Sequence, residues 1–229
     1  MRKGCIVGCF LVFIFFINCS LSQLRILSLP SQIERIEGYA SLRVRGEQGT
    51  ARSKFSFLFQ FPNQGRIEVS NVFGKTLYQI IIEKRGAFFL IPSKKVYWEG
   101  EEEEIIDIFL GFRLNFNELV SLLSGQWSGE GMDLREENWH EGWILEKDAL
   151  GRIIRGRREE LRFEVKDFFK NTSVVRFLTF QHPLSSGRLK ILTINFNQLL
   201  RKEAFSLAFL KDYERKTWAE IEEILNEKN

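Results

Sequence analysis

Four phenylalanines at alternate positions, Phe55, Phe57, Phe59 and Phe61, constrain this chain more than any other feature of its sequence. Successive side chains of a β-strand point to opposite faces, so the segment 54–61 predicts a strand with four aromatic rings on one face. Such a face is stable only when it is covered by other apolar groups. We therefore expect a sheet whose inner face carries most of the core.

Apolar residues also alternate on both sides of this strand. Two further apolar faces are formed by Ile67 and Val69 in one segment and by Tyr78, Ile80 and Ile82 in another. Short turns rich in Gly, Pro and Asn separate these segments, which is typical of an antiparallel meander. Besides 54–61, the predicted strands cover residues 39–45, 66–70, 76–83, 87–91 and 95–98.

The apolar period then changes to that of helices. Residues 101–110 start with four glutamates, and acidic groups stabilise the positive end of a helix dipole. A cation site in this run is the less favoured alternative. Asn115 and Glu118 have the spacing of a capping box, and Gly125 is a suitable helix stop. The sequence thus predicts two short helices.

Alternation returns in the second half of the chain, and the tail from Phe205 to Leu225 has helical periodicity, with Trp218, Ile221 and Ile224 on one stripe. A long antiparallel sheet tends to curl or close. We therefore expect a mainly β (α+β) fold: a half-open, strongly curved antiparallel β-barrel of about ten strands, with short helices as a lid and a C-terminal helix. The later strands are predicted over 143–146, 152–156, 161–168, 173–180 and 188–195.

The first residues have the pattern of an export signal. Arg2 and Lys3 precede an apolar run over 6–17, which is too short to span a bilayer and has the length of a signal-peptide core. The three cysteines of the chain, Cys5, Cys9 and Cys19, all lie in this leader, and Cys19 comes just after the end of the apolar run. This arrangement resembles the lipobox of bacterial lipoproteins and implies cleavage before Cys19 and attachment of lipid to its thiol. Secretion with an incidental cysteine is the alternative.

The expected organisation is a signal peptide over 1–18, a lipidated N-terminus and linker over 19–31, and a single domain over 32–229. Removing Arg2 and Lys3 leaves 31 basic side chains against 30 acidic ones, so no global field favours nucleic acid. The densest basic run lies within 152–158. It could meet phosphate head groups at a membrane, but we favour a solvated hairpin edge because acidic residues follow it.

Catalytic chemistry is not expected. The chain has two histidines, His140 and His182, and neither has the spacing of a zinc site. Phosphate-binding glycine loops, nucleophile elbows and dinucleotide fingerprints are absent from the sequence. We therefore predict a protein without catalytic residues, metal or cofactor, and keep an exported enzyme as the least favoured alternative.

The phenylalanine face allows two interpretations. Aromatic stripes usually fill a core, which is the default. If two short helices cover a large curved sheet incompletely, the inner face would instead be an apolar groove wide enough for acyl chains. The residue pattern does not distinguish a filled barrel from one with a ligand cavity.

Several segments together resemble a known family. They are Gly38–Val44, Ile67–Gly74, Phe109–Gly111 and Leu114–Gly125. Their order is similar to that of the LolB-like outer-membrane lipoproteins, which have the LolA/LolB fold. The resemblance implies a hydrophobic cavity under a helical lid. It also implies a receptor that accepts lipoproteins from a periplasmic LolA-like carrier and inserts them into the outer membrane.

The resemblance also suggests site residues. In this family an exposed apolar turn inserts into the membrane, and Val72 and Phe73 occupy that place here; a hairpin whose Phe folds inward is the plain alternative. Ser20 after Cys19 implies the outer membrane, facing the periplasm. The competing hypothesis is a structural envelope lipoprotein that binds protein partners through its C-terminal helix. The predicted acyl-binding residues are Phe55, Phe57, Phe59, Phe61, Ile67, Val69, Tyr78, Ile80 and Ile82.

Overall fold

The computed structural model describes residues 29–47, 49–71, 73–84, 86–125, 142–201 and 203–227. The predicted leader, Cys19, Val72 and His140 lie outside the described residues. Twelve strands in the described part form a single sheet. They are β1 (Arg35–Gly46), β2 (Gly49–Gln60), β3 (Gln64–Ser70), β4 (Thr76–Glu83), β5 (Gly86–Ile91), β6 (Val96–Gly100), β7 (Ile144–Lys147), β8 (Ile153–Arg158), β9 (Leu161–Phe168), β10 (Val175–His182), β11 (Ser185–Phe196) and β12 (Glu214–Arg215).

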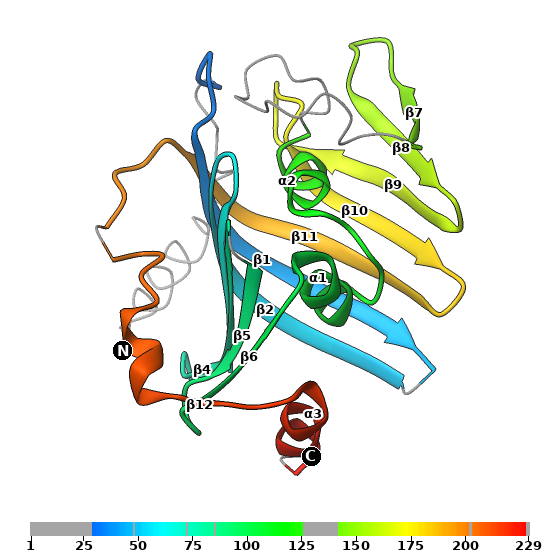
Figure 1. Cartoon of the computed structure of the whole chain (residues 1–229). Coiled ribbons are helices and arrows are strands. Elements are labelled where there is room, and N and C mark those ends of the chain that lie inside the picture. The colour runs from blue at the N-terminus through cyan, green and yellow to red at the C-terminus, as the bar shows by residue number, and fades with distance from the viewer. Residues whose placement is uncertain are drawn as a thin grey trace, which may run out of the picture.

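The sheet is one curved, unclosed surface (Figure 1). Its strand order is β12-β6-β5-β4-β3-β2-β1-β11-β10-β9-β8-β7. Two antiparallel meanders meet where β1 pairs with β11, and the short β12 is the parallel exception. The predicted fold class, a strongly curved antiparallel sheet with helices, is confirmed.

Two helices lie on the inner face of the sheet, α1 (Glu102–Leu110) and α2 (Phe116–Ser124) (Figure 1). The predicted capping box is present, because Asn115 and Glu118 each accept a hydrogen bond from the backbone N–H of the other. Gly125 ends α2 in the left-handed conformation, with φ of 71°. Local sequence signals therefore set both ends of this helix.

The C-terminal segment differs from the prediction of one helix over 205–225. It forms a 3₁₀ helix (Ala208–Asp212), then β12, and only then α3 (Trp218–Asn226). The reason is a second apolar cluster on the outer face of the sheet. Ile81, Phe88 and Leu90 are buried there under side chains of the C-terminal segment, which are Leu207, Phe209, Leu210 and Tyr213.

Beyond β12, which pairs with β6 at the edge of the sheet, the chain places α3 against the inner face. The ring of Trp218 lies 4.9 Å from that of Trp98 and 5.5 Å from that of Phe89, and Ile221 is completely buried. The apolar stripe of α3 therefore packs on the sheet. No helix in the described parts of the chain is long and apolar enough to cross a membrane.

Candidate functional site

All nine side chains predicted to bind acyl chains belong to one apolar cluster on the inner face. Phe55, Phe57 and Phe59 are at most 2% exposed, whereas Phe61 and Tyr78 pack partly buried against the cluster. The cross-strand register explains this grouping, because Phe57 faces Ile67 and Ile67 faces Ile80 in adjacent strands. The period-two pattern therefore identified a common surface correctly.

In this structure the two short helices fill the surface. Phe109 of α1 packs edge-on against Phe55 with 5.0 Å between ring centroids, and Phe116 of α2 packs against Phe59 at 5.3 Å. A space remains between α2 and strands β9 and β10, but it measures only about 10 Å³. A chain-like ligand thus fits beneath the helices only if a helix moves.

A buried charge holds α2 in place. Glu118 is 1% exposed, and its carboxylate contacts the guanidinium of Arg158 and accepts a hydrogen bond of 2.7 Å from the indole N–H of Trp143. Arg158 also donates to the carbonyl of Arg113 at 2.8 Å, next to the start of α2. The sequence identified Glu118 only as a capping residue. Its second role depends on β8, 40 residues later.

The contacts that hold α1 on the sheet are mostly apolar. Its inner stripe consists of Ile105, Ile106, Phe109 and Leu110. Polar links lie near its two ends. The Glu102 carboxylate accepts the backbone N–H of Phe116 at 3.0 Å, and the Ser185 hydroxyl donates to the carbonyl of Gly111 at 2.9 Å. Among the described residues, the buried ion pair that involves one of these two helices belongs to α2, whereas the Asp107–Arg113 pair of α1 is exposed.

A hollow of about 1490 Å³ opens beside α1. On its inner side it is lined by Leu42, Val44 and Tyr78 from the sheet and by Ile108 and Phe109 from α1. Ala51 faces Val44 across β1 and β2 and is exposed in this hollow. The hollow therefore leads from solvent to Val69 and Tyr78 at the edge of the apolar inner face.

Tyr78 allows a test of this arrangement by pH. Burial raises the pKa of its hydroxyl to about 12, from an ordinary 10.0. The hydroxyl therefore ionises at a lower pH in the unfolded chain than in the folded one. Burial of the neutral hydroxyl contributes fully to the free energy of unfolding below pH 10, and about 2 to 3 kcal/mol of this free energy is lost as the pH rises toward 12. In urea unfolding, Tyr78→Phe should lose less stability than the wild type over this interval. Equal losses would contradict the burial of Tyr78.

The turn between β3 and β4 presents an exposed aromatic ring. Phe73 is 90% exposed, so the alternative in which it folds inward does not hold. The side-chain oxygen of Asn71 accepts the backbone N–H groups of Phe73 and Lys75, both at 3.0 Å. The turn is thus ordered by an Asn side chain while its ring stays in solvent.

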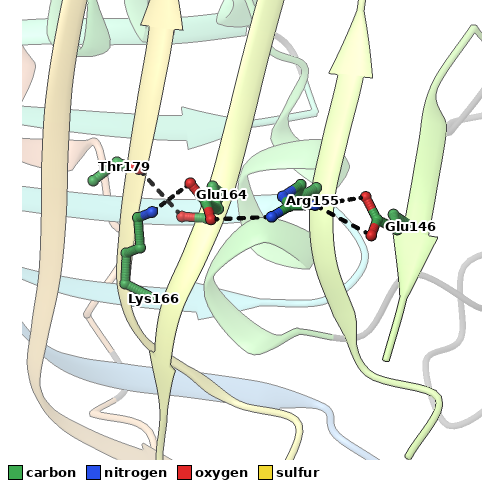
Figure 2. Close-up of polar contacts among 5 residues, drawn as sticks. All are labelled: Glu146, Arg155, Glu164, Lys166 and Thr179. Atoms are coloured by element: carbon green, nitrogen blue, oxygen red, sulfur yellow. Dashed lines mark hydrogen bonds and ion pairs between the residues drawn. The ribbon is translucent and has the colours of Figure 1, made fainter. Parts of the chain in front are cut away.

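The basic run over 152–158 is largely neutralised, but not as the predicted hairpin edge, because β8 lies between β7 and β9. Arg155 contacts Glu146 at 3.2 Å and Glu164 at 3.5 Å, across strands β7, β8 and β9 (Figure 2). Arg152 pairs with Asp148 at 2.7 Å, and Arg158 pairs with Glu118. This run therefore offers few free cations to a phosphate group.

His182 is the histidine that lies among the described residues. His182 ends β10, and its Nδ1 accepts only a long hydrogen bond of 3.4 Å from the backbone of Leu184. Among the described residues, no three His, Cys, Asp or Glu side chains gather to hold a metal ion. The features that could serve a function are thus the covered apolar face, the hollow beside α1 and the exposed turn.

Comparison with known proteins gives a fold and no sequence family. No family model matches the chain, and no curated protein matches it. A solved domain named as an outer membrane lipoprotein-sorting protein, from Vibrio parahaemolyticus, has a TM-score of 0.53 and 10% identity, covering 77% of this chain and 91% of that one. A DUF1329 family protein from Desulfovibrio piger has a TM-score of 0.54 and 9% identity, covering 78% and 92%.

A LolA superfamily protein from Nitrosomonas europaea is also similar, with a TM-score of 0.48, 7% identity and coverage of 80% and 94%. At such identities likeness shows the fold alone. This chain has the curved, unclosed sheet with inner helices that is seen in the Vibrio lipoprotein-sorting domain, so the expected LolA-like fold is confirmed. The narrower resemblance to LolB-like proteins stays a prediction.

Proposed function

We propose that this protein binds the acyl chains of lipids or lipoproteins between α1 and the inner face of its sheet, and so takes part in lipoprotein delivery in the bacterial envelope. The observation that carries the proposal is a continuous apolar cluster on the inner face that is covered by the apolar stripe of α1. Beside that helix, an open hollow reaches the same face. The fold shared with a lipoprotein-sorting domain supports it.

The proposed exchange needs no covalent chemistry. When α1 moves away, its four buried apolar side chains lose contacts worth roughly 1.5–3 kcal/mol each, so the empty protein stays closed. An acyl chain entering through the hollow replaces those contacts and selects the open state. Cargo then moves toward whichever site or bilayer buries its chains better, without nucleotide hydrolysis.

Lipid on Cys19 and insertion of the turn at Val72 and Phe73 complete the proposal. A multiply acylated cysteine would hold the domain at the membrane, because each buried CH₂ contributes about 0.8 kcal/mol. The exposed ring of Phe73 would enter the same surface. We infer an outer-membrane location facing the periplasm, with a LolA-like carrier as the donor of cargo. The alternative that α3 binds protein partners has less support, since its apolar stripe is covered.

A bulky side chain in the hollow should block acyl binding. Ala51→Trp places an indole opposite Val44 without touching the packed core. We expect the affinity for a fluorescent triacylated lipopeptide to fall roughly tenfold or more, because bulk in an occupied volume costs about 1–3 kcal/mol. The measurement is a fluorescence titration of the full chain carrying Cys19→Ser, which removes the acylation site.

Thr50→Trp is the matched control. Thr50 precedes Ala51 in β2, is also exposed, and points to the opposite face of the sheet. This variant should bind the lipopeptide as tightly as the parent. If both variants bind like the parent, or if no lipopeptide binds to any of the three proteins, the proposed acyl site is wrong.

A further inference from the structure

Three arginines face one another across the outer side of the sheet. Arg43 of β1 lies directly opposite Arg52 of β2 on one side and Arg188 of β11 on the other. Directly opposite residues of antiparallel strands share a face, with Cβ atoms about 4.5–5.5 Å apart. We call Arg52, Arg43 and Arg188 the arginine row.

The arginine row has no carboxylate partner among the described residues, where its three members form no ion pair. The same line of residues continues from Arg188 through Thr179 to Glu164 and Arg155. There the charges alternate, as the Glu146–Arg155–Glu164 contacts show (Figure 2). The charges at the end of the line that holds Glu164 and Arg155 are therefore neutralised, whereas those of the arginine row are not.

Keeping these arginines together opposes folding. Like charges directly opposite each other in a sheet are destabilising. The charge of Arg52, followed by partial burial and the charges of Arg188 and Arg45, lowers the pKa of Arg43. Arg157 and Arg162 also lie opposite each other, in β8 and β9. Among the described strands, however, only Arg43 has an arginine opposite it on both sides, and this group of three indicates a surface kept for an anionic partner.

The surroundings of the row are also cationic. The 1490 Å³ hollow extends to this outer side, and the only carboxylate among its described lining residues is Asp167, which pairs with Arg176 at 3.0 Å. Its basic lining residues are Arg43, Arg52, Lys54, Arg176, Arg188 and Lys190.

The exposed turn adjoins this surface. Lys54 is paired with Ser70, and Ser70 is the last residue before the segment that carries Phe73. An exposed apolar ring beside a group of unpaired cations is the combination that binds an anionic lipid surface, with the ring among acyl chains and the cations at the phosphates.

We propose that the arginine row is a docking surface for the phosphate head groups of an anionic phospholipid bilayer. This goes beyond acyl binding and does not depend on it, because the row lies on the outer face and the proposed acyl site on the inner face. Docking through this face would set the hollow and the Phe73 turn close to the bilayer.

Vesicle flotation tests the proposal. The full chain carrying Cys19→Ser should partition onto vesicles of phosphatidylethanolamine mixed with phosphatidylglycerol, and only weakly onto phosphatidylethanolamine alone. Replacing all three arginines of the row by glutamine should weaken binding to the anionic vesicles on the order of a hundredfold, since each basic residue contributes about fivefold. Raising the salt concentration should also weaken binding to the anionic vesicles, because ions screen exposed charges.

A matched triple variant separates this surface from net charge. Lys94→Gln, Lys147→Gln and Lys211→Gln remove the same charge at exposed positions on other parts of the molecule. This control should bind anionic vesicles like the parent. Equal weakening in both triple variants, or unchanged binding of the arginine variant, would overturn the proposal. If the arginine variant still binds the vesicles but no longer binds an acidic periplasmic protein, the row docks a protein and not a bilayer, and the proposal is also overturned.

Two further readouts complete the test. The arginine variant should unfold at the same or a higher temperature than the parent, since like-charge repulsion is removed. Phe73→Ser should weaken binding to both kinds of vesicle, because an apolar contact does not depend on lipid charge. A parent protein that binds the anionic vesicles but does not bind the lipopeptide would refute the acyl site and leave the arginine row supported.

Discussion

Replacing Glu118 by alanine is expected to destabilise this domain by about 3 to 5 kcal/mol, the range for breaking a buried ion pair from one side. The carboxylate is 1% exposed and satisfies three donors: the guanidinium of Arg158, the indole N–H of Trp143 and the backbone N–H of Asn115. All three would lose their acceptor in the variant. Urea unfolding followed by tryptophan fluorescence measures the loss.

Glu103→Ala is the control for this variant. Glu103 lies in the first turn of α1 and is exposed, so its loss should change stability by no more than about 0.5 kcal/mol. Glu118→Gln, which keeps an oxygen acceptor, should fall between the two. A Glu118→Ala protein within about 1 kcal/mol of the wild type would show that α2 is held by its apolar face alone.

The fold follows from local patterns to a large extent. Alternation around Phe55–Phe61 placed the inner face of the sheet correctly, and the Asn115–Glu118 spacing located the start of α2. Both features depend on neighbours within a few residues. The Glu118–Arg158 contact could not be predicted in this way, because it requires the curvature that brings β8 over α2.

The location of the unpaired positive charges also could not be predicted from local sequence patterns. The sequence directs attention to the run over 152–158, yet the fold supplies most of its arginines with carboxylates. The unpaired cations come from Arg43, Arg52 and Arg188, which are distant in sequence and meet only through the pairing of β2, β1 and β11. The register of these strands is the information that a linear pattern lacks.

The C-terminal segment was mispredicted for a related reason. Its apolar residues have helical spacing, but those before Trp218 bury themselves on the outer face over Ile81, Phe88 and Leu90. A sheet that is apolar on one face in most strands and on both faces in β5 provides this second surface. Burial of apolar side chains on that surface outweighs helix propensity, which is small per residue.

Gly125→Ala should be the other strongly destabilising change, with an expected loss of roughly 2 to 5 kcal/mol from left-handed backbone strain and a steric clash. An added Cβ would lie 1.9 Å from the carbonyl oxygen of Ser173, which is backbone and cannot turn away. The end of α2 must therefore move off the segment before β10. Hydrogen exchange of the α2 amides should become faster, and urea unfolding should report the loss.

Gly111→Ala is the matched control, because Gly111 ends α1 in the same left-handed conformation, with φ of 84°. There an added Cβ would lie 3.2 Å from the Ser185 hydroxyl oxygen and 3.3 Å from the Ser185 Cβ, contacts that a shift of a few tenths of an ångström relieves. Its cost should be limited to about 1–2 kcal/mol of backbone strain. If the two variants lose equal stability, the close approach of Gly125 to Ser173 does not hold α2 down. If only Gly125→Ala exposes the α2 amides, that approach and Glu118 together fix α2, and α1 remains the helix free to open.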